Sequence, residues 1–163
     1  MSKIDWTNFT VRIPVKAPMK KLYDAWTRAS ELENWFLRRA AYKGADKKPV
    51  RRTAAITKGC TFQWEWYGYD GVEKGVVKQV NGKDHVQFTF AGSLVDVRLR
   101  QLEKEVIVEL VQSAIPTDPA SKKNVRMGCH VGWTFWLANL KSVYEGGINL
   151  RNTNEELKGM INN

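Results

Sequence analysis

Between residues 61 and 110, apolar and polar side chains alternate repeatedly, which is the pattern of β-strands with one buried and one solvated face. Phe62, Trp64 and Trp66 alternate with polar residues, and the same alternation returns at 85–90, 95–99 and 105–110. Turn residues separate these stretches at 69–71, 81–82, 92–93 and 103–104. The pattern predicts an antiparallel sheet with a single apolar face. The stretch 71–80 alternates less cleanly, and we expect a β-bulge near Gly75.

The residues before this region predict one strand and two short helices. A strand at 6–13 is expected to end at Pro14. Pro18 suits the first turn of a helix, and the residues after it recur at helical spacing: Met19, Leu22, Tyr23 and Trp26. Ser30 and Glu33 have the S-x-x-E spacing of a capping box. A second helix is therefore expected to open there and to run into Trp35 and Phe36.

A long helix is predicted near the C-terminus, over residues 128–151. At 100° per residue, one face of it collects Cys129, Trp133, Trp136, Leu137, Leu140 and Tyr144. Gly146 and Gly147 supply a stop, because glycine adopts a left-handed conformation at little cost. Val131 and Phe135 fall close to the opposite side, which should meet solvent. The tail 153–163 has a short helical pattern and could either pack over that side or fray.

A one-sided sheet needs a cover for its apolar face, and the long helix carries a matching stripe. The two elements should therefore pack against each other. Bulky rings seldom fill a curved space completely, so a cavity between helix and sheet is plausible, and such cavities usually bind small ligands. A core that is packed solid is the alternative.

The net charge of +9 is concentrated in one segment, residues 37–58, which has eight Lys or Arg residues and one acid, Asp46. We expect a partly ordered connection here, because the segment contains Gly44, Pro49 and few large apolar residues. It is either a solvated basic loop or an attractive surface for an acidic protein partner. The candidate basic surface consists of Arg38, Arg39, Lys47, Lys48, Arg51 and Arg52. Nucleic acid is not expected as a partner, since Tyr42 is the one aromatic residue interleaved among these charges and no binding motif occurs.

Length and composition favour a single domain, residues 1–152, followed by the tail. No apolar run approaches the roughly 18 residues that would span a bilayer, and the first residues lack the features of a signal peptide. We therefore expect no membrane span and a cytoplasmic location. Cys60 and Cys129 lack disulfide or metal-site spacing, so both are expected to be buried as small apolar residues.

Catalytic signals are weak, and we expect neither an enzyme nor a cofactor or metal site. The two histidines are His85, on the wet side of a strand, and His130, on the edge of the helical stripe. His130 follows Cys129, but adjacent helical residues point about 100° apart and do not form a nucleophile and base pair. Motifs of phosphate loops, serine hydrolases and zinc proteases are absent from the sequence.

The order of strand, two helices, further strands and a final helix resembles the helix-grip fold of the START-like superfamily, also called SRPBCC. Three blocks are similar to the C-terminal domain of the activator of the ninety-kilodalton heat-shock protein (Hsp) ATPase. They are APMKKLYDAWT at 17–27, ENWF at 33–36 and GCHVGWTFWLANLK at 128–141, and Gln112-Ser113 with Ile115-Pro116 also fits. The resemblance implies an α+β fold in which an antiparallel sheet of about six to seven strands wraps around the C-terminal helix. It also implies ligand binding or, as an alternative, a co-chaperone-like interaction in the stress response. Full co-chaperone activity is not expected, because this chain has no room for a separate chaperone-binding domain.

The sequence thus predicts a domain that binds a small hydrophobic or amphipathic molecule, such as a lipid, between the sheet and the final helix. The expected walls of the cavity are Trp35, Phe36, Phe62, Trp64, Trp66, Phe88, Trp133, Trp136 and Leu140. Arg38 or Lys58 is expected at its mouth. A protein-interaction module that uses the basic surface is the alternative, and an enzyme that uses the cavity is the least expected class.

Overall fold

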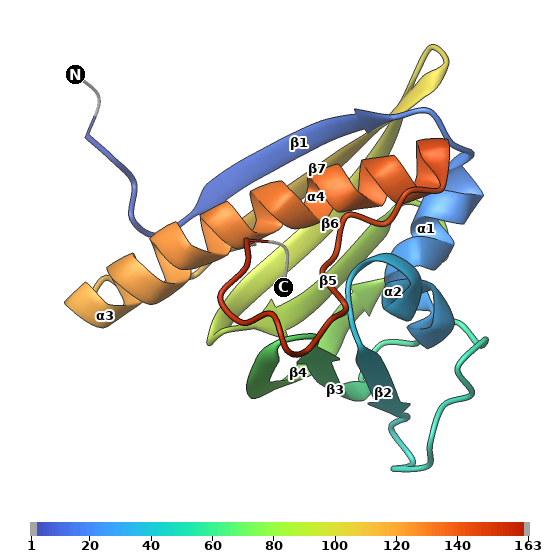
Figure 1. Cartoon of the computed structure of the whole chain (residues 1–163). Coiled ribbons are helices and arrows are strands. Elements are labelled where there is room, and N and C mark those ends of the chain that lie inside the picture. Colours follow the sequence, from blue (N-terminus) through green and yellow to red (C-terminus); the bar gives the residue numbers. More distant parts are fainter. Residues whose placement is uncertain (1–2, 162–163) are drawn as a thin grey trace.

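A computed structural model describes residues 3–161 and shows a seven-stranded antiparallel sheet folded around a long helix (Figure 1). The strands are β1 (Phe9–Val15), β2 (Arg39–Lys43), β3 (Thr61–Trp66), β4 (Tyr69–Val80), β5 (His85–Phe90), β6 (Ser93–Leu102) and β7 (Glu105–Ser113). The helices are α1 (Met19–Thr27), α2 (Ala29–Trp35), α3 (Pro119–Ser121), the π-helical turn η1 (Lys122–Met127) and α4 (Gly128–Gly146). The predicted α+β helix-grip fold is confirmed.

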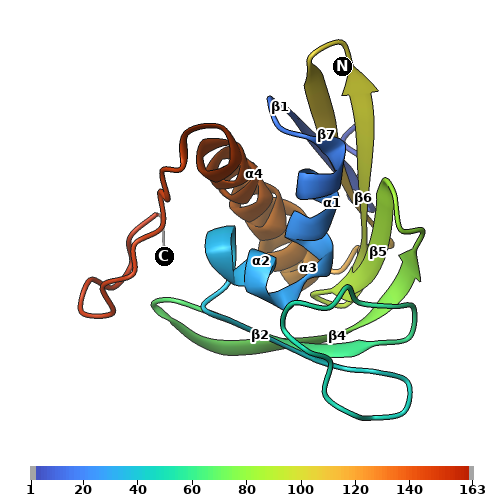
Figure 2. The same ribbon diagram turned by 90° about the vertical axis from the view of Figure 1, so that its right-hand side faces the viewer.

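The sheet has the order β1-β7-β6-β5-β4-β3-β2, so every strand but one lies beside its sequence neighbour. The exception is β1, which pairs with the last strand, β7, and forms one edge of the sheet. Figure 2 shows the sheet curving around α4, with α1 and α2 inside the curve. The apolar residues of the predicted alternation, such as Phe62, Val97 and Val108, are buried on this concave side. The core therefore lies between the sheet and the helices.

The helix α4 begins and ends almost as its sequence predicts, at Gly128 and at Gly146 rather than Arg151. Gly147 has a left-handed φ of 71° and its N–H donates to the Val143 carbonyl, which closes the helix. Lys141 Nζ donates to the Pro14 carbonyl at 2.6 Å, and Asn139 Nδ2 donates to the Trp35 carbonyl at 2.5 Å. These two contacts attach the C-terminal half of α4 to β1 and to α2.

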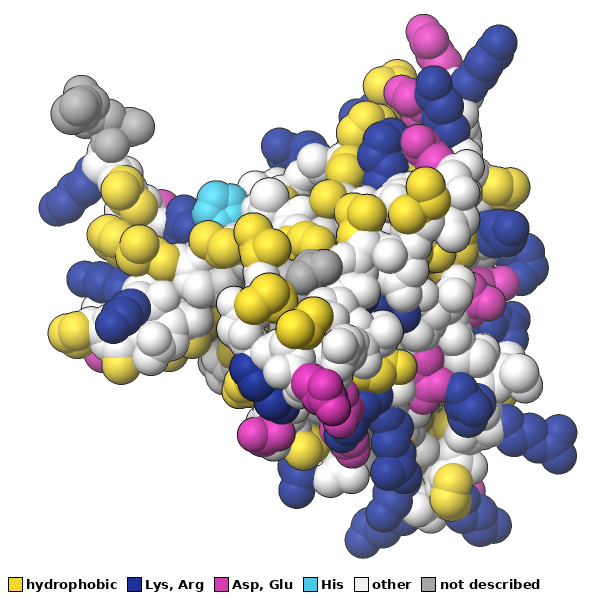
Figure 3. Space-filling view, viewed as in Figure 1, with side chains coloured by type: hydrophobic (Ala, Val, Ile, Leu, Met, Phe, Trp, Pro, Cys, Tyr) yellow, Lys and Arg dark blue, Asp and Glu magenta, His cyan; other side chains and the backbone are white. Residues whose placement is uncertain are grey.

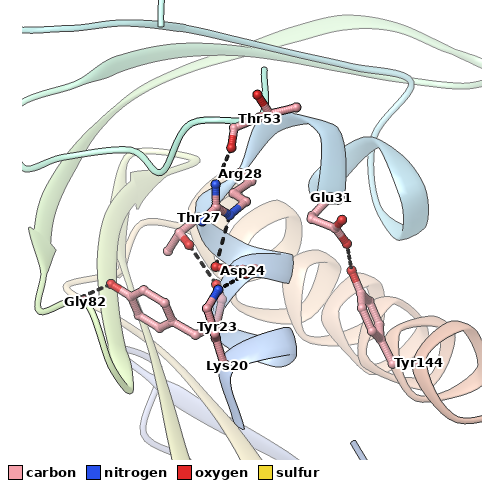
Figure 4. A network of polar contacts seen from close by, with 9 residues as sticks. All are labelled: Lys20, Tyr23, Asp24, Thr27, Arg28, Glu31, Thr53, Gly82 and Tyr144. Carbon is pink, nitrogen blue, oxygen red and sulfur yellow. Dashed lines mark hydrogen bonds and ion pairs between the residues drawn. The ribbon is translucent and has the colours of Figure 1, made fainter. Parts of the chain in front are cut away.

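The helices α1 and α2 are fixed by polar contacts that reach three other parts of the chain (Figure 4). Tyr23 accepts from the Gly82 N–H at 2.8 Å, which ties α1 to the β4–β5 turn. Arg28 pairs with Asp24 at 3.1 Å and donates to the Thr53 carbonyl in the loop after β2. Tyr144 donates to Glu31 at 2.5 Å, which ties α4 to α2, and burial raises the pKa of this phenol.

Several boundaries in the N-terminal half differ from the sequence prediction. The first strand runs through Pro14 to Val15, because β1 is an edge strand, where a missing N–H is tolerated. The predicted capping box is wrong: Arg28 caps α2 without a side-chain hydrogen bond. Glu33 instead accepts from the Ala40 N–H at 3.0 Å and pairs with Arg52.

The strand β4 also departs from prediction in two places. The ladder with β5 shifts between Val77 and Gln79, so the irregularity lies past Gly75. The turn before β4 falls at 67–68, because Trp66 already pairs with Tyr69. Gly75 has another role, since a Cβ there would lie 2.3 Å from the Phe62 ring.

The basic segment contains one strand that the sequence analysis missed, β2, which pairs with β3. Its Ala40 and Tyr42 face the core, and the short apolar pattern is hidden among charged neighbours. Within residues 153–161 the short helical pattern of the tail forms no helix, and turns occur instead. Cys60 is buried as expected, but Cys129 is only partly buried.

Candidate functional site

A cavity of about 470 Å³ lies between the N-terminal half of α4 and the β3–β4 hairpin, which Figure 1 shows beneath that half of the helix. We refer to it as the glycine pocket. It is lined by Phe36, Trp66, Tyr69, Val72, Glu73, Phe90, Ala91, Asn124, Gly128, Cys129, Gly132, Trp133 and Trp136. Tyr69 and Val72, which are 62% and 50% exposed, form its rim. Its volume lies within the range of about 300–1,000 Å³ that is usual for small-molecule sites.

The pocket exists because α4 presents glycine where its other turns present large side chains. Gly128 and Gly132 are four residues apart and therefore lie on one side of the helix. A Cβ added at Gly132 would meet no atom within 4 Å. On the strand side, the ring of the rim residue Tyr69 lies over Gly71, where a Cβ would come within 2.3 Å of it. The free volume is thus on the helix side of the pocket.

Four aromatic rings in mutual contact make the apolar wall. Phe36 lies 5.6 Å from Trp66 and 5.2 Å from Trp133, measured between ring centroids. The ring of Phe90 packs against the other two, with its centroid 5.1 Å from that of Trp133 and 6.3 Å from that of Trp66. Aromatic pairs at these separations pack favourably and resist deformation. The wall is consequently rigid, and Trp136 extends it at 5.1 Å from Phe36.

A buried chain of hydrogen bonds holds two of these rings from behind. Trp133 Nε1 donates to Gln112 Oε1 at 2.9 Å, and Gln112 Nε2 donates to Ser93 Oγ at 2.7 Å. Ser93 Oγ donates in turn to the Phe90 carbonyl at 2.7 Å. Gln112 is fully buried, so its amide has no solvent to replace these partners. The network fixes Trp133 and the Phe90 backbone relative to each other.

Glu73 is the one charged residue among those that line the pocket. Its Oε1 accepts from the Ala91 N–H at 2.9 Å, and Ala91 sits in the β5–β6 turn with a left-handed φ of 48°. Burial raises the pKa of the Glu73 carboxyl, and the hydrogen bond from Ala91 partly opposes that effect. Within residues 3–161 the carboxyl has no ion-pair partner.

The sequence analysis did not identify Glu73, although a signal was present. Glu73 has the same parity as Val77, which is buried, while Val72 and Lys74 have the opposite parity. An acid on the inward side of an irregular strand was therefore visible in the sequence. The prediction missed it because the alternation of this strand is irregular, so its inward-facing positions were not assigned.

Cys129 is the second reactive group in the pocket, and it is held as a neutral thiol. Burial raises its pKa, the interaction with Gln112 opposes the rise, and the nearby charge of Glu73 adds to it. His130 does not act on this thiol, since its ring packs against Phe9 with centroids 4.9 Å apart. The two neighbouring side chains diverge, as the helical spacing predicts.

The predicted cavity residues divide into two groups. Four of them line the glycine pocket: Phe36, Trp66, Trp133 and Trp136. The other five lie behind the pocket, in the core: Trp35, Phe62, Trp64, Phe88 and Leu140. The indole N–H of Trp35 donates to the Ala25 carbonyl, and that of Trp64 donates to the Tyr42 hydroxyl. Neither Arg38 nor Lys58 lies among the residues that line the pocket.

The basic surface lies over β2 and the loop that follows it, where Lys and Arg side chains project in Figure 3. Arg38 pairs with Glu65 and with Glu155 of the tail, both at 2.9 Å, and Arg52 pairs with Glu33. In the described chain no acid pairs with the remaining four, which are Arg39, Lys47, Lys48 and Arg51. A shallow depression of about 630 Å³ adjoins this surface along β2.

A polar group on the outer face of the sheet joins His85 and Asp96. His85 Nε2 lies 2.7 Å from Asp96 Oδ1, and Gln87 donates to the other carboxylate oxygen at 3.0 Å. The sequence analysis placed His85 correctly on the wet side but missed this partner, which lies 11 residues away on the adjacent strand. Among residues 3–161 no group of three or more His, Cys, Asp or Glu is arranged to hold a metal ion. None of the helices in that range has the length and apolar character needed to cross a membrane.

Comparisons with solved structures show the same architecture. The Aha1 dimer from Colwellia psychrerythraea matches with a TM-score of 0.67 and 20% identity, covering 86% of this chain and 97% of that one. Protein SSP2350 from Staphylococcus saprophyticus matches with a TM-score of 0.68 and 15% identity, covering 88% and 96%. DynU16, from the dynemicin biosynthetic locus, gives 0.69 and 20%, covering 90% of this chain and 50% of its own. These identities support the fold alone.

A search of the curated proteins finds no match. The family model described as "Activator of Hsp90 ATPase homolog 1-like protein" matches residues 16–145, from the residue before Ala17 to near the end of α4. The match includes all three sequence blocks that carry the resemblance. The chain therefore belongs to the family of activator of Hsp90 ATPase homolog 1-like proteins, within the START-like superfamily.

Proposed function

We propose that the protein binds a small hydrophobic or amphipathic molecule in the glycine pocket. The observation that carries the proposal is the vacancy beside Gly132, in a pocket whose lining includes four aromatic rings packed against one another. A pocket that is already shaped loses little conformational entropy when a ligand enters it. Membership of a family with a ligand-binding type of fold supports the proposal at a coarser level.

The test is to fill the vacancy from the helix side. Gly132→Leu places a side chain in the space where no atom lies within 4 Å, so the variant should fold and lose the site. Thr134→Leu is the matched control, because Thr134 is exposed on the same helix. Naphthylmethanol is a suitable neutral probe, and isothermal titration calorimetry measures its binding. We expect saturable binding by the wild type and by Thr134→Leu, and none by Gly132→Leu.

Two results would count against a binding role for the pocket. One is the absence of saturable probe binding by the wild type, and the other is equal binding by the wild type and Gly132→Leu. Native mass spectrometry of gently purified protein gives the mass of any natural ligand. A retained molecule adds to the mass of the native protein and is lost when the protein is denatured.

The basic surface supports a second proposal, in which an acidic protein partner docks over β2 and the following loop. The supporting observation is that four exposed cations have no acidic partner within the described chain, namely Arg39, Lys47, Lys48 and Arg51. Reversing the charge of Lys47, Lys48 and Arg51 should abolish a salt-sensitive association and leave naphthylmethanol binding unchanged. An association that survives charge reversal and high salt would reject this role.

A further inference from the structure

The glycine pocket combines aromatic rings with a single carboxylate, and this combination indicates the charge of the ligand. We propose that the pocket selects an organic cation, an amine or a quaternary ammonium group attached to an apolar body. The inference rests on the proposed binding function and adds a chemical class to it. The inference uses two features of the pocket: the carboxylate of Glu73, which has no ion-pair partner in residues 3–161, and the wall of aromatic rings.

Glu73 is positioned to receive a cation. The Ala91 N–H occupies its Oε1, while Oε2 has no hydrogen-bond partner anywhere in residues 3–161. The backbone contact orients the carboxylate without neutralising its charge. A half-buried carboxylate without an ion pair carries a desolvation cost, which a bound cation would relieve.

No basic side chain competes for this carboxylate. The lining contains neither Lys nor Arg, although the chain carries 26 such residues. Of the other ionisable residues that line the pocket, Tyr69 and Cys129, neither is basic, and burial raises the pKa of the Cys129 thiol. Seven of the nine net positive charges come from residues 37–58, over β2 and its loop, and none of those residues lines the pocket. The pocket is thus a local anionic site on a basic protein.

The ring wall supplies the second interaction that cations prefer. An ammonium group is attracted to the face of Trp, Tyr or Phe, and Trp gives the strongest attraction. The wall contains Trp66 and Trp133 together with Phe36 and Phe90, and Tyr69 stands at the rim, 6.2 Å from Trp66. An anionic ligand would meet both the carboxylate and the negative ring faces. The same surface therefore attracts a cation and repels an anion.

Three probes with one ring system separate charge from shape: naphthylmethylammonium, naphthylmethanol and naphthylacetate. Calorimetry at neutral pH compares them on the wild type, on Glu73→Gln and on Glu105→Gln, a control carboxylate at the start of β7, outside the pocket. In the wild type we expect the cation to bind most tightly and the anion most weakly. Glu73→Gln should weaken the cation roughly ten- to a hundredfold and change naphthylmethanol less than about twofold. Glu105→Gln should match the wild type.

The outcomes distinguish this inference from the proposed function. If naphthylmethanol binds and Gly132→Leu abolishes its binding, the pocket is a ligand site whatever its charge preference. If the cation then binds no more tightly than naphthylmethanol, or Glu73→Gln leaves the cation unaffected, the cation inference is wrong. Failure of all three probes to bind the wild type overturns both proposals. Thermal melting of Glu73→Gln establishes that the variant is folded before its affinities are compared.

Discussion

The two halves of α4 lie against the same curved sheet, yet one half is packed solid and the other borders a cavity. One row of the helix contains Gly128, Gly132, Trp136 and Leu140, each four residues after the last. Leu140 is fully buried and Trp136 partly buried, whereas a Cβ at Gly132 would meet no atom within 4 Å and one at Gly128 would meet the Lys123 carbonyl oxygen at 3.6 Å. The backbone path is shared, so side-chain volume along one row decides where the protein is hollow.

The two halves also differ in how polar groups are used. In the solid half, Asn139 bonds the Trp35 carbonyl and accepts from the Leu150 N–H, so its amide connects neighbouring elements. Beside the hollow half, the polar network lies behind the rings, and one oxygen of the Glu73 carboxylate on β4 has no hydrogen-bond partner among the described residues. The polar groups of the first half thus bond within the fold, whereas we propose that the carboxylate beside the second half meets a ligand.

Leu140→Ala should produce the largest loss of stability, because it creates a cavity in the solid half. We expect the free energy of unfolding to fall by about 2–5 kcal/mol, measured by urea denaturation. Val131→Ala, at a position that is 70% exposed on the same helix, should change it by less than about 0.5 kcal/mol. A loss below about 1 kcal/mol for Leu140→Ala would mean that the two halves do not differ in packing.

Gln112→Ala should cause the next largest loss of stability, because it removes the hydrogen-bond partner of Trp133 Nε1 and one partner of Ser93 Oγ. We expect a loss of about 1–3 kcal/mol, together with a change in near-ultraviolet circular dichroism as Trp133 loses its fixed orientation. Gln79→Ala, at an exposed position in β4, serves as the control. An unchanged tryptophan signal would show that the rings hold themselves in place without the network.

Gly132→Ala should stabilise the protein by about 0.5–1 kcal/mol, because alanine favours a helix over the flexible glycine and its Cβ meets no neighbour. Thermal or urea denaturation measures the gain. Gly75→Ala should do the reverse, since its Cβ would lie 2.8 Å from the Thr89 carbonyl oxygen and closer still to the Phe62 ring. A loss of stability in Gly132→Ala would show that the helix side of the pocket is already filled.

The pH dependence of stability should show the smallest effect. The pKa of Glu73 is raised above its usual value near 4.5, so folding favours the protonated carboxyl. The resulting stabilisation is complete below that usual pKa and is lost as the pH rises through the raised value. Urea denaturation between pH 4 and 7 should therefore show a stability that falls with pH relative to Glu73→Gln. The variant retains Cys129 and Tyr69, the other titratable groups of the pocket, so the difference reports on Glu73.

An identical pH profile for wild type and Glu73→Gln would mean that the carboxyl is fully solvated. That result would remove the electrostatic contrast between the two halves of the helix. A cationic probe at saturation should reverse the trend, because it favours the charged carboxylate.

The sequence predicted the solid half of the molecule better than the hollow half. Leu137, Leu140 and Tyr144 were assigned to the core face of α4 by helical spacing alone, and the hydrogen-bonded stop at Gly147 was expected from its residue type. Strands with strict alternation, such as β6 and β7, were also predicted, because their side chains point alternately to the buried and to the solvated face of the sheet. These features depend on local periodicity, which a sequence displays directly.

The cavity walls were harder to predict, because ring residues of the core and of the pocket look alike in sequence. Phe62 and Trp66 lie on the same face of β3, but Trp66 borders the pocket and Phe62 is buried against Gly75. Their separation depends on where the helix crosses the sheet. The short β2 strand and the His85–Asp96 contact were missed for a related reason, since both are defined by partners on another strand.

The sequence by itself determined the class of fold, the inward face of most strands and the row of residues along α4, since these follow from the periods of helix and strand. Only the tertiary structure decided that Gly132 faces empty space, that Glu73 points toward the same space, and that Cys129 lies beside it. The volume and the charge of a cavity depend on residues that are distant in sequence and come together only when the chain packs. A local sequence pattern therefore cannot predict them.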